Sequence, residues 1–205
     1  MSPITSGEQK INTRMANTAQ ISPPDGFRYQ TDILPADEEQ VLVEHIRELP
    51  LKEYEFHGFA AKRRVIYYGW QYDSGESRLK QIGAMQTYLL QVRQRAAAFA
   101  GLPVDDLALA QVIEYAPGAA IGWHRDRAVF GDIIGISLLA PCKFRFRRKT
   151  GPTWERYSLT AEPRSMYLLR GAARNEWQHS IPTVDALRYS IIFRSLRAAE
   201  GSSFG

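Results

Sequence analysis

The sequence predicts a mainly β protein of the α+β class, with its strands arranged as a sandwich or jelly roll. After about residue 108, short apolar stretches alternate with turn signals, and no helical pattern separates them. In CKFRFRRK (142–149), apolar and basic residues alternate, which predicts a strand with one face in the core and one in water. Helical periodicity occurs only in the N-terminal half, so we expect the helices to be grouped there.

The N-terminal half contains four predicted elements. Phe27–Leu34 is expected to be a strand, and a helix follows with Asp37 as N-cap and Gln40 at the capping-box position. Its apolar face is formed by Val41, Leu42, Ile46 and Leu49. The aromatic-rich stretch 62–73 is a strand or a loop. A longer helix lies within 77–100, where apolar residues from Leu79 to Phe99 recur at helical spacing, and Gly101 and Pro103 end it.

The C-terminal half contains six predicted strands, at 107–115, 132–139, 142–149, 156–162, 165–171 and 188–196. We therefore divide the chain into a flexible polar tail (1–24), an N-terminal segment with the helices (25–107), a β core (108–197) and a C-terminal tail (198–205).

Composition is that of an ordinary globular protein, with 44% hydrophobic and 23% charged residues. The net charge of +4 and the pI of about 9.2 are compatible with an anionic partner but do not establish one. A lone cysteine, Cys142, excludes an internal disulfide and fits a reducing compartment. The first 20 residues have no apolar core, so we expect neither a secretory signal nor a membrane anchor. We expect a cytoplasmic monomer that does not contact membranes.

The motif WHRD (123–126) first suggests two chemistries, that of a protein kinase and that of a metal site. A kinase catalytic loop needs an asparagine five residues after the aspartate, and Gly131 occupies that position. The chain also has neither a glycine-rich phosphate loop with its lysine nor a DFG motif. These absences exclude the kinase.

Histidine and aspartate two residues apart leave the same face of a strand, so His124 and Asp126 are able to bind one metal ion. Of the other histidines, His45 lies at a helix border and His57 in a loop-like stretch, whereas His179 follows a predicted strand. Two histidines and one carboxylate form the facial triad that binds Fe(II) and leaves positions for a co-substrate and oxygen. On its own, this pattern also occurs by chance.

The last strand carries a second signal. Arg188, Ser190, Ile192 and Arg194 share one of its faces, while Tyr189, Ile191 and Phe193 share the other. Buried arginines are costly unless an anion meets them, and a dicarboxylate would do so in bidentate geometry. Periodicity alone does not decide which face points inward, but the metal triad just upstream favours the arginine face.

The stretches EYAPGAAIGWHRD, WQHSIP and RYSIIFR together resemble the AlkB family of Fe(II)/2-oxoglutarate dioxygenases, over roughly residues 110–197. The resemblance implies a double-stranded β-helix core, one iron site, 2-oxoglutarate and O2 as co-substrates, and oxidative demethylation of nucleobases. It implies that His124, Asp126 and His179 bind the iron. It also implies a 2-oxoglutarate site made by Tyr115, Arg188, Ser190 and Arg194, with Arg188 at the distal carboxylate, although Tyr115 could instead serve only packing. Arg174 matches a family arginine near the substrate, or is a solvated loop residue.

Three departures weaken parts of this resemblance. Ile113 and Ser190 stand where the family often has asparagine, which affects the polar network around the co-substrate. Ala128 stands where repair enzymes often carry an acidic residue, so lesion repair is less secure than the dioxygenase chemistry, and RAVFGDIIGISL looks closer to the RNA-modifying branch.

The aromatic and basic stretch 56–73 is expected to form the family's nucleotide-recognition lid, with Arg63, Tyr68 and Trp70 contacting the substrate. The alternative is a half-buried strand in which Tyr67 or Tyr68 belongs to the core. The expected activity is oxidative demethylation of alkylated bases in DNA or RNA, with release of succinate, CO2 and formaldehyde. A dioxygenase acting on a protein or small molecule, or a non-catalytic nucleic-acid-binding relative, stays open.

Overall fold

The computed structural model describes residues 22–56, 59–73, 75–76 and 78–197, and side chains are described except at 54–61. The predicted C-terminal tail, most of the N-terminal tail and His57 lie outside the described residues. The elements in chain order are β1 (Phe27–Gln30), α1 (Ala36–Arg47), β2 (Lys52–Phe56), β3 (Phe59–Asp73), β4 (Arg78–Gln81), α2 (Thr87–Ala100), the 3-10 helix η1 (Val104–Asp106), β5 (Leu109–Tyr115), β6 (Ile121–His124), β7 (Phe130–Leu138), β8 (Cys142–Thr150), β9 (Thr153–Ala161), β10 (Ser165–Leu169), α3 (Gly171–Asn175), β11 (Gln178–Ile181) and β12 (Arg188–Leu196).

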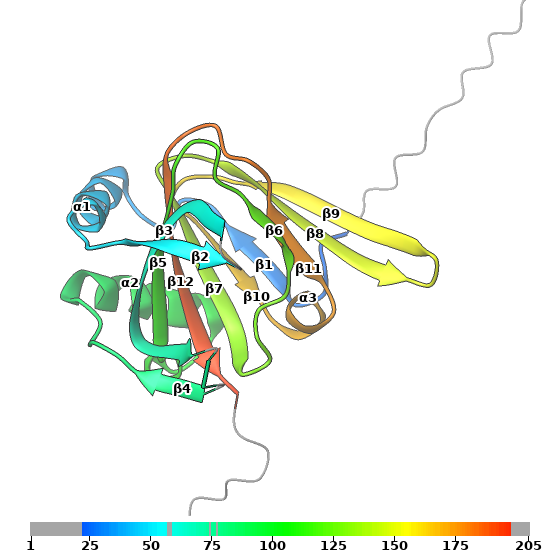
Figure 1. Cartoon of the computed structure of the whole chain (residues 1–205), viewed down its shortest axis with the longest axis horizontal. Helices are drawn as coiled ribbons and strands as arrows, with labels where there is room; N and C mark the ends of the chain where they lie inside the picture. The colour runs from blue at the N-terminus through cyan, green and yellow to red at the C-terminus, as the bar shows by residue number, and fades with distance from the viewer. Residues whose placement is uncertain (1–21, 57–58, 74, 77, 198–205) are drawn as a thin grey trace, which may run out of the picture.

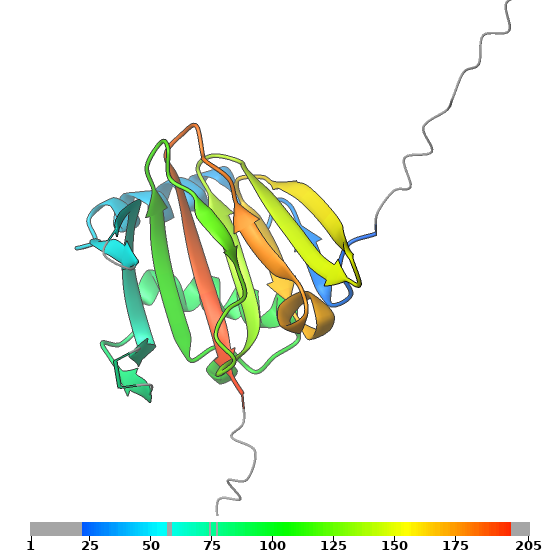
Figure 2. The same ribbon diagram turned by 45° about the vertical axis from the view of Figure 1, so that its right-hand side comes forward.

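Two antiparallel sheets form the body of the molecule (Figure 1). The large sheet has the order β1-β10-β7-β12-β5-β3-β2, with β4 paired to β3, and the small sheet has the order β6-β11-β8-β9. Helices α1 and α2 lie on one face of the large sheet, and the small sheet lies on the other (Figures 1 and 2). The predicted mainly β jelly-roll class with N-terminal helices is therefore confirmed.

The strands before residue 107 belong to the same large sheet as the strands after it. β3 pairs with β5 along seven register positions, and β1 pairs with β10. The N-terminal segment thus extends the sheet of the β core, and the domain limits at 25–107 and 108–197 stay a prediction.

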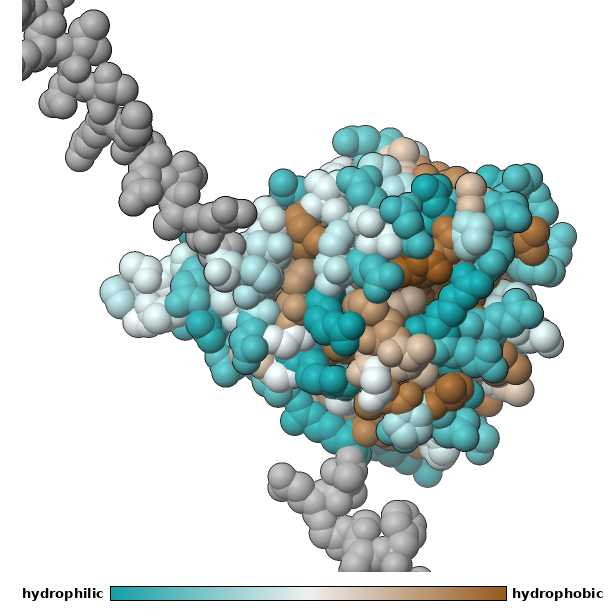
Figure 3. Space-filling model, turned by 180° about the vertical axis from the view of Figure 1, so that it is seen from behind, coloured by the Kyte–Doolittle hydropathy of each residue, from teal (hydrophilic) through white to brown (hydrophobic). Residues whose placement is uncertain are grey.

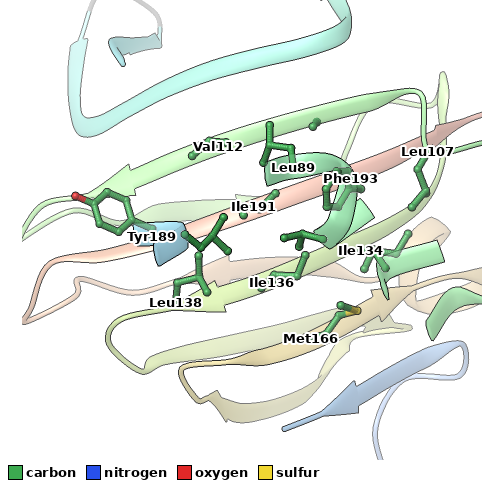
Figure 4. Close-up of a cluster of buried hydrophobic side chains, with 14 of the residues drawn as sticks. Leu89, Leu107, Val112, Ile134, Ile136, Leu138, Met166, Tyr189, Ile191 and Phe193 are labelled. Atoms are coloured by element: carbon green, nitrogen blue, oxygen red, sulfur yellow. The ribbon is translucent and has the colours of Figure 1, made fainter. Parts of the chain in front are cut away.

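Both faces of β12 are buried, because this strand lies in the middle of the large sheet. Tyr189, Ile191 and Phe193 point toward the helices and join the core that contains Leu89 and Val112 (Figure 4). Ile192 points the other way, into a second core with Phe144 and the other apolar residues of β8. The face of β12 that carries Arg188 and Arg194 therefore points toward the small sheet. This is the orientation that we expected from the nearby metal triad.

Strand β8 confirms its predicted alternation. Cys142, Phe144 and Phe146 are buried in the core between the sheets, while the basic residues between them are not. One face of the small sheet thus closes the core, and the other is turned to solvent.

The predicted helix within 77–100 is wrong in its first turns. Residues 78–81 form β4, paired with the end of β3, and α2 begins only at Thr87. Leu79 packs on the core between the sheets instead of on a helix face. The apolar residues here are spaced three and four apart, as in a helix. Residues 78–81 nevertheless form a strand, because they pair with the end of β3.

The start of α1 also corrects the sequence-based expectation. Pro35 is the N-cap and makes no side-chain hydrogen bond, so Asp37 lies in the first turn, where its charge favours the helix dipole. Val41 is exposed, while Leu42, Val43 and Ile46 are buried. β1 ends at Gln30, earlier than the predicted Leu34.

The surface mixes hydrophilic residues with separate apolar patches, as the view from behind shows (Figure 3). Among the described residues, no helix is long and apolar enough to cross a membrane.

Candidate metal centre

The end of β6 and the start of β11 bring the three predicted metal ligands together. His124 and His179 are register partners across the β6–β11 pair, and their ring centroids are 4.3 Å apart. Asp126 follows β6 by two residues, and one ligand atom from each of the three side chains lies within 4.8 Å of the others. This spacing suits a single ion bound by all three.

A backbone carbonyl determines which nitrogen of His124 is available to a metal. His124 Nδ1 lies 2.9 Å from the carbonyl oxygen of Gly122, which only accepts hydrogen bonds. Nδ1 must therefore carry the proton and donate it. The lone pair of Nε2 is left for an ion, and the ring is oriented as in many metal sites.

Asp126 is held in its charged form by Arg194. The Arg194 Nε and Nη2 groups lie 3.0 and 2.9 Å from Asp126 Oδ1, and Oδ2 is left facing His179 Nε2 at 3.7 Å. Burial is the largest single effect and raises the pKa of this carboxyl, but the Arg194 guanidinium together with His179, His124 and Arg174 outweighs burial, and the pKa lies below its ordinary range. One oxygen is thus fixed by the protein and the other is free to bind a cation.

His179 is buried, and burial lowers its pKa to about 3. The ring is therefore neutral at pH 7, so its contact with Asp126 is not an ion pair. A neutral imidazole is the form that binds a metal ion.

A chain of hydrogen bonds connects the metal ligands to β3. Arg194 Nη1 donates to Gln111 Oε1 at 2.9 Å, and Gln111 Nε2 donates to the Tyr67 hydroxyl at 3.0 Å. Gln111 was not predicted as a site residue. Its signal was available, because it is a polar residue within the otherwise apolar stretch LALAQVIEY.

A second polar site lies beside the metal ligands, around Arg188. This side chain is 2% exposed, its guanidinium carbon lies 4.5 Å from the centre of the Tyr115 ring, and Nη2 donates to Ser137 Oγ at 3.0 Å. Arg188 Nε, Arg188 Nη1 and Ser190 Oγ are buried and have no hydrogen-bond partner among the described residues. Nor does any described carboxylate form an ion pair with Arg188.

Buried donors without partners are rare and costly, so this cluster indicates a binding site for an anionic ligand. A carboxylate would accept hydrogen bonds from both free guanidinium nitrogens in fork geometry. The residues therefore fit a co-substrate that carries a carboxylate at this end, next to an ion held by the triad.

The cavity around the triad has walls that sequence reasoning missed. Tyr167 and Phe144 line it, with ring centroids 4.6 Å apart. A Cβ atom at Gly135 would lie 2.1 Å from Cζ of Tyr167, so glycine is required at that position. A glycine inside the strand DIIGISL is a typical signal of such a close approach.

The predicted substrate residues are divided between the two faces of the large sheet. Arg63 is the register partner of Tyr115 and so lies on the metal side. Trp70 packs on the core between the sheets, also on the metal side. Tyr68 is 6% exposed and belongs to the core under the helices, which corrects the prediction that it contacts substrate.

Gly69 explains why Trp70 and Tyr72 face the metal side together with Tyr67. Its φ of +74° interrupts the strand alternation, and a Cβ atom there would lie 2.1 Å from the carbonyl oxygen of Ala108. Tyr72 also touches the loop after the metal ligands, because the guanidinium carbon of Arg127 lies 4.6 Å from its ring centre.

Arg174 is buried in α3, and its guanidinium donates hydrogen bonds to three backbone carbonyls. Nε donates to Gly131 at 3.1 Å, and Nη2 donates to Arg127 at 2.5 Å and to Phe130 at 3.0 Å. These bonds hold the loop after Asp126 in place, and the contact of Arg174 with a substrate stays a prediction.

Comparison with known families agrees with this geometry. The sequence model described as the 2OG-Fe(II) oxygenase superfamily matches residues 26–194, which include all three triad residues and Arg188. The chain belongs to that superfamily. Its members use Fe(II), 2-oxoglutarate and O2, and both the triad and the orphaned donors of Arg188 fit this set.

Curated relatives confirm the resemblance to the AlkB family. The chain is 32% identical over 166 residues to an Arabidopsis thaliana protein named "Alkylated DNA repair protein ALKBH8 homolog", which covers 67% of this chain and 47% of the relative. It is 37% identical over 92 residues to the mouse mitochondrial alpha-ketoglutarate-dependent dioxygenase alkB homolog 7, which covers 43% of this chain and 40% of the relative. The chain thus matches less than half the length of either relative.

Solved structures show the same fold at low identity. OsALKBH1 matches with a TM-score of 0.61 at 12% identity, covering 83% of this chain and 98% of that one. A prolyl-4-hydroxylase from Pseudomonas putida matches with a TM-score of 0.58 at 15% identity, covering 84% and 94%.

Proposed function

We propose that this chain is a Fe(II)/2-oxoglutarate-dependent dioxygenase that oxidatively demethylates alkylated bases in nucleic acid. The observation that carries the nucleic-acid part is the composition of the β3 face on the metal side. Tyr67, Trp70 and Tyr72 offer aromatic rings there, and Arg63 adds a cation on the same side. Rings and cations together suit a base that leaves its stack and the phosphates that flank it.

The residues of the site divide the work. His124, Asp126 and His179 would hold Fe(II), which supplies the oxidising chemistry with O2 when bound. Arg188 would bind and orient 2-oxoglutarate through Nε and Nη1, with Ser190 Oγ as a further hydrogen-bonding group. Arg194 keeps Asp126 ionised and fixes one of its oxygens, so that the other is presented to the cation.

In the overall reaction, 2-oxoglutarate supplies the electrons that O2 needs beyond those taken from the methyl group. One oxygen atom of O2 enters 2-oxoglutarate, which loses CO2 and becomes succinate, and the other hydroxylates the methyl group on the base. The N–CH2OH group then breaks its C–N bond, returns a proton to the nitrogen and leaves as formaldehyde. The Tyr115 ring and the apolar wall with Ile133 and Ile192 limit the access of water to the site.

The names of the relatives agree with this proposal, since the Arabidopsis protein is described as an alkylated DNA repair protein. The structure of this chain is also similar to that of a prolyl-4-hydroxylase. One fold supports many functions, so this similarity does not decide between substrate classes.

The test is whether iron-loaded protein converts 2-oxoglutarate to succinate, and whether oligonucleotides with N-methylated bases accelerate that conversion. We expect methylated oligonucleotides to stimulate succinate formation and to lose the mass of a methylene group, while unmethylated ones of the same sequence do neither. Turnover without stimulation by any methylated DNA or RNA would contradict the proposal and favour a protein or small-molecule substrate. Absence of all turnover with bound iron would favour a non-catalytic relative.

A further inference from the structure

The outer face of the small sheet carries a continuous group of basic and aromatic residues. Because Cys142, Phe144 and Phe146 point inward, strand alternation turns the cations at 143, 145, 147 and 149 outward. The β8–β9 register places Trp154 opposite Lys149 and Arg156 opposite Arg147, so β9 extends the same face. We call this surface the basic face; its residues are Trp123, Lys143, Arg145, Arg147, Lys149, Trp154 and Arg156.

Two arginines of the basic face lie over indole rings. The guanidinium carbon of Arg147 lies 4.5 Å from the ring centre of Trp123 and 4.5 Å from that of Trp154. Arg145 lies 4.9 Å from Trp123. Their Nε groups are also occupied, since Arg147 donates to Gln178 at 2.7 Å and Arg145 donates to Ser180 at 3.1 Å.

These contacts order both guanidinium groups, and within the described part of the chain each group donates only one hydrogen bond. Arginines that serve only solubility are usually mobile, because ordering a long side chain costs entropy. Here the entropy is already lost in the free protein, so the Nη groups are preorganised to meet an acceptor.

No acidic residue neutralises the basic face within the described part of the chain. None of its five cations forms an ion pair there, although Arg148 in the same strand, pointing to the opposite side, pairs with both Glu155 and Glu176. Like charges side by side on one sheet face repel each other. The arrangement is therefore suited to a polyanion and is not balanced by the protein itself.

The geometry points to single-stranded nucleic acid as the partner of the basic face: we propose that its phosphates bind the five cations and that a base stacks on Trp154. Trp154 is 38% exposed although Arg147 lies over its ring, so part of the indole is open to a ligand. An acidic peptide would satisfy the charges but would leave the aromatic residues without a matching group.

The position of the basic face relative to the metal centre supports this partner. Trp123 immediately precedes His124 in β6, and Gln178 immediately precedes His179 in β11. The two strands thus present metal ligands on one side and the basic face on the other, and β6 is an edge strand of its sheet (Figure 2). A bound strand would pass round this edge to the site. The inference rests on the proposed function and adds a second contact region far from β3.

The test is the salt dependence of binding to fluorescein-labelled single-stranded DNA and RNA, measured by fluorescence anisotropy with the full chain. We expect the double variant Lys149→Gln/Arg156→Gln to reduce the slope of log Kd against log salt by about 1.4, because each lost phosphate contact removes about 0.7. Trp154→Ala should weaken binding by about fivefold or more at every salt concentration, with little change in slope.

The matched control is Arg47→Gln/Arg95→Gln, which removes the same charge from exposed positions on α1 and α2. It should bind like the parent, and thermal unfolding should show that all variants are folded. If the parent binds oligonucleotides but both basic-face variants bind equally well with the same slope, the basic face is not the contact region. If polyglutamate competes as well as nucleic acid and Trp154→Ala has no effect, the assignment of nucleic acid as the partner of the basic face is overturned.

Failure of the proposed function would look different. In that case methylated oligonucleotides would not stimulate succinate formation by the parent, whatever the variants bind. If methylated oligonucleotides stimulate succinate formation by the parent but the basic-face variants bind them like the parent, only the assignment of the basic face is overturned.

Discussion

Replacing Arg188 by methionine should stabilise the ligand-free protein and weaken its binding of 2-oxoglutarate at the same time. Methionine keeps an unbranched side chain in the core but removes the charge and the donors. Arg188 is 2% exposed, donates from Nη2 to Ser137, lies over the Tyr115 ring and leaves Nε and Nη1 without partners.

The magnitude follows from these contacts. Two buried donors without partners cost about 1–3 kcal/mol each, and the hydrogen bond to Ser137 with the contact to Tyr115 returns about 1–2 kcal/mol in total. Arg188→Met should therefore raise the free energy of unfolding without ligand by about 1–4 kcal/mol, in line with other buried charges replaced by apolar residues. Each charge-assisted hydrogen bond to a carboxylate contributes about 1.5–3 kcal/mol, so affinity for 2-oxoglutarate should fall on the order of tenfold or more.

The assay is thermal unfolding of Mn(II)-loaded protein over a range of 2-oxoglutarate concentrations. The parent gains about 2.7 kcal/mol when the ligand is at 100 times its Kd, whereas Arg188→Met should start higher and respond only at much higher concentrations. Arg188→Lys should restore the response only in part, because an ammonium group cannot form the fork.

Arg170 provides the matched control for this experiment, because its guanidinium is already paired with Asp132 at 2.5 Å. Arg170→Met should lower stability and leave the response to 2-oxoglutarate intact. A lower Tm for Arg188→Met without ligand, combined with an unchanged response to 2-oxoglutarate, would refute the assignment of its free donors to a carboxylate.

Three further predictions concern the metal centre and its surroundings. His179→Ala should abolish stoichiometric binding of Mn(II), measured by electron paramagnetic resonance, while His45→Ala on α1 should not; full binding by the first variant would remove His179 from the ligand set. Gln111→Leu should release Arg194 and weaken metal binding by about threefold to tenfold, less than loss of a ligand, because the effect passes through a second side chain. Titration of Mn(II) measures this, and an unchanged Kd would show that Arg194 needs no support. Gly135→Ala should lower the free energy of unfolding by about 1–3 kcal/mol in chemical denaturation, since its Cβ would lie 2.1 Å from a tyrosine ring; a neutral effect would mean that the ring moves freely.

The grouping of the three candidate metal ligands was predictable because two of them form a local pattern and only one lies far away in the sequence. His124 and Asp126 lie at the end of one strand, and His179 was the one downstream histidine in a chain with four. The alternation of β8 was predictable for the same reason, since strand geometry puts every second residue in the core.

Sequence periodicity predicted the structure less well where contacts with distant parts of the chain determine the local structure. Residues 78–81 have helical spacing but pair with β3, so the predicted helix loses its first turns. Tyr68 looked like a substrate contact because the stretch is rich in aromatics, yet it alternates with Tyr67 and lies under the helices, and only the break at Gly69 turns Trp70 and Tyr72 to the metal side.

By itself, the sequence predicted the mainly β class, the candidate triad of His124, Asp126 and His179 and the shared face of Arg188 and Arg194, because these depend on residue type and on strand periodicity. Strand periodicity left open which face of β12 meets the small sheet; the metal triad favoured the arginine face, and the packing of Ile192 between the sheets agrees. Tertiary structure alone decided which donors of Arg188 stay without partners and which arginines of β8 are held by tryptophans. Such facts depend on distances between strands that are far apart in the chain, and no single-strand periodicity contains them.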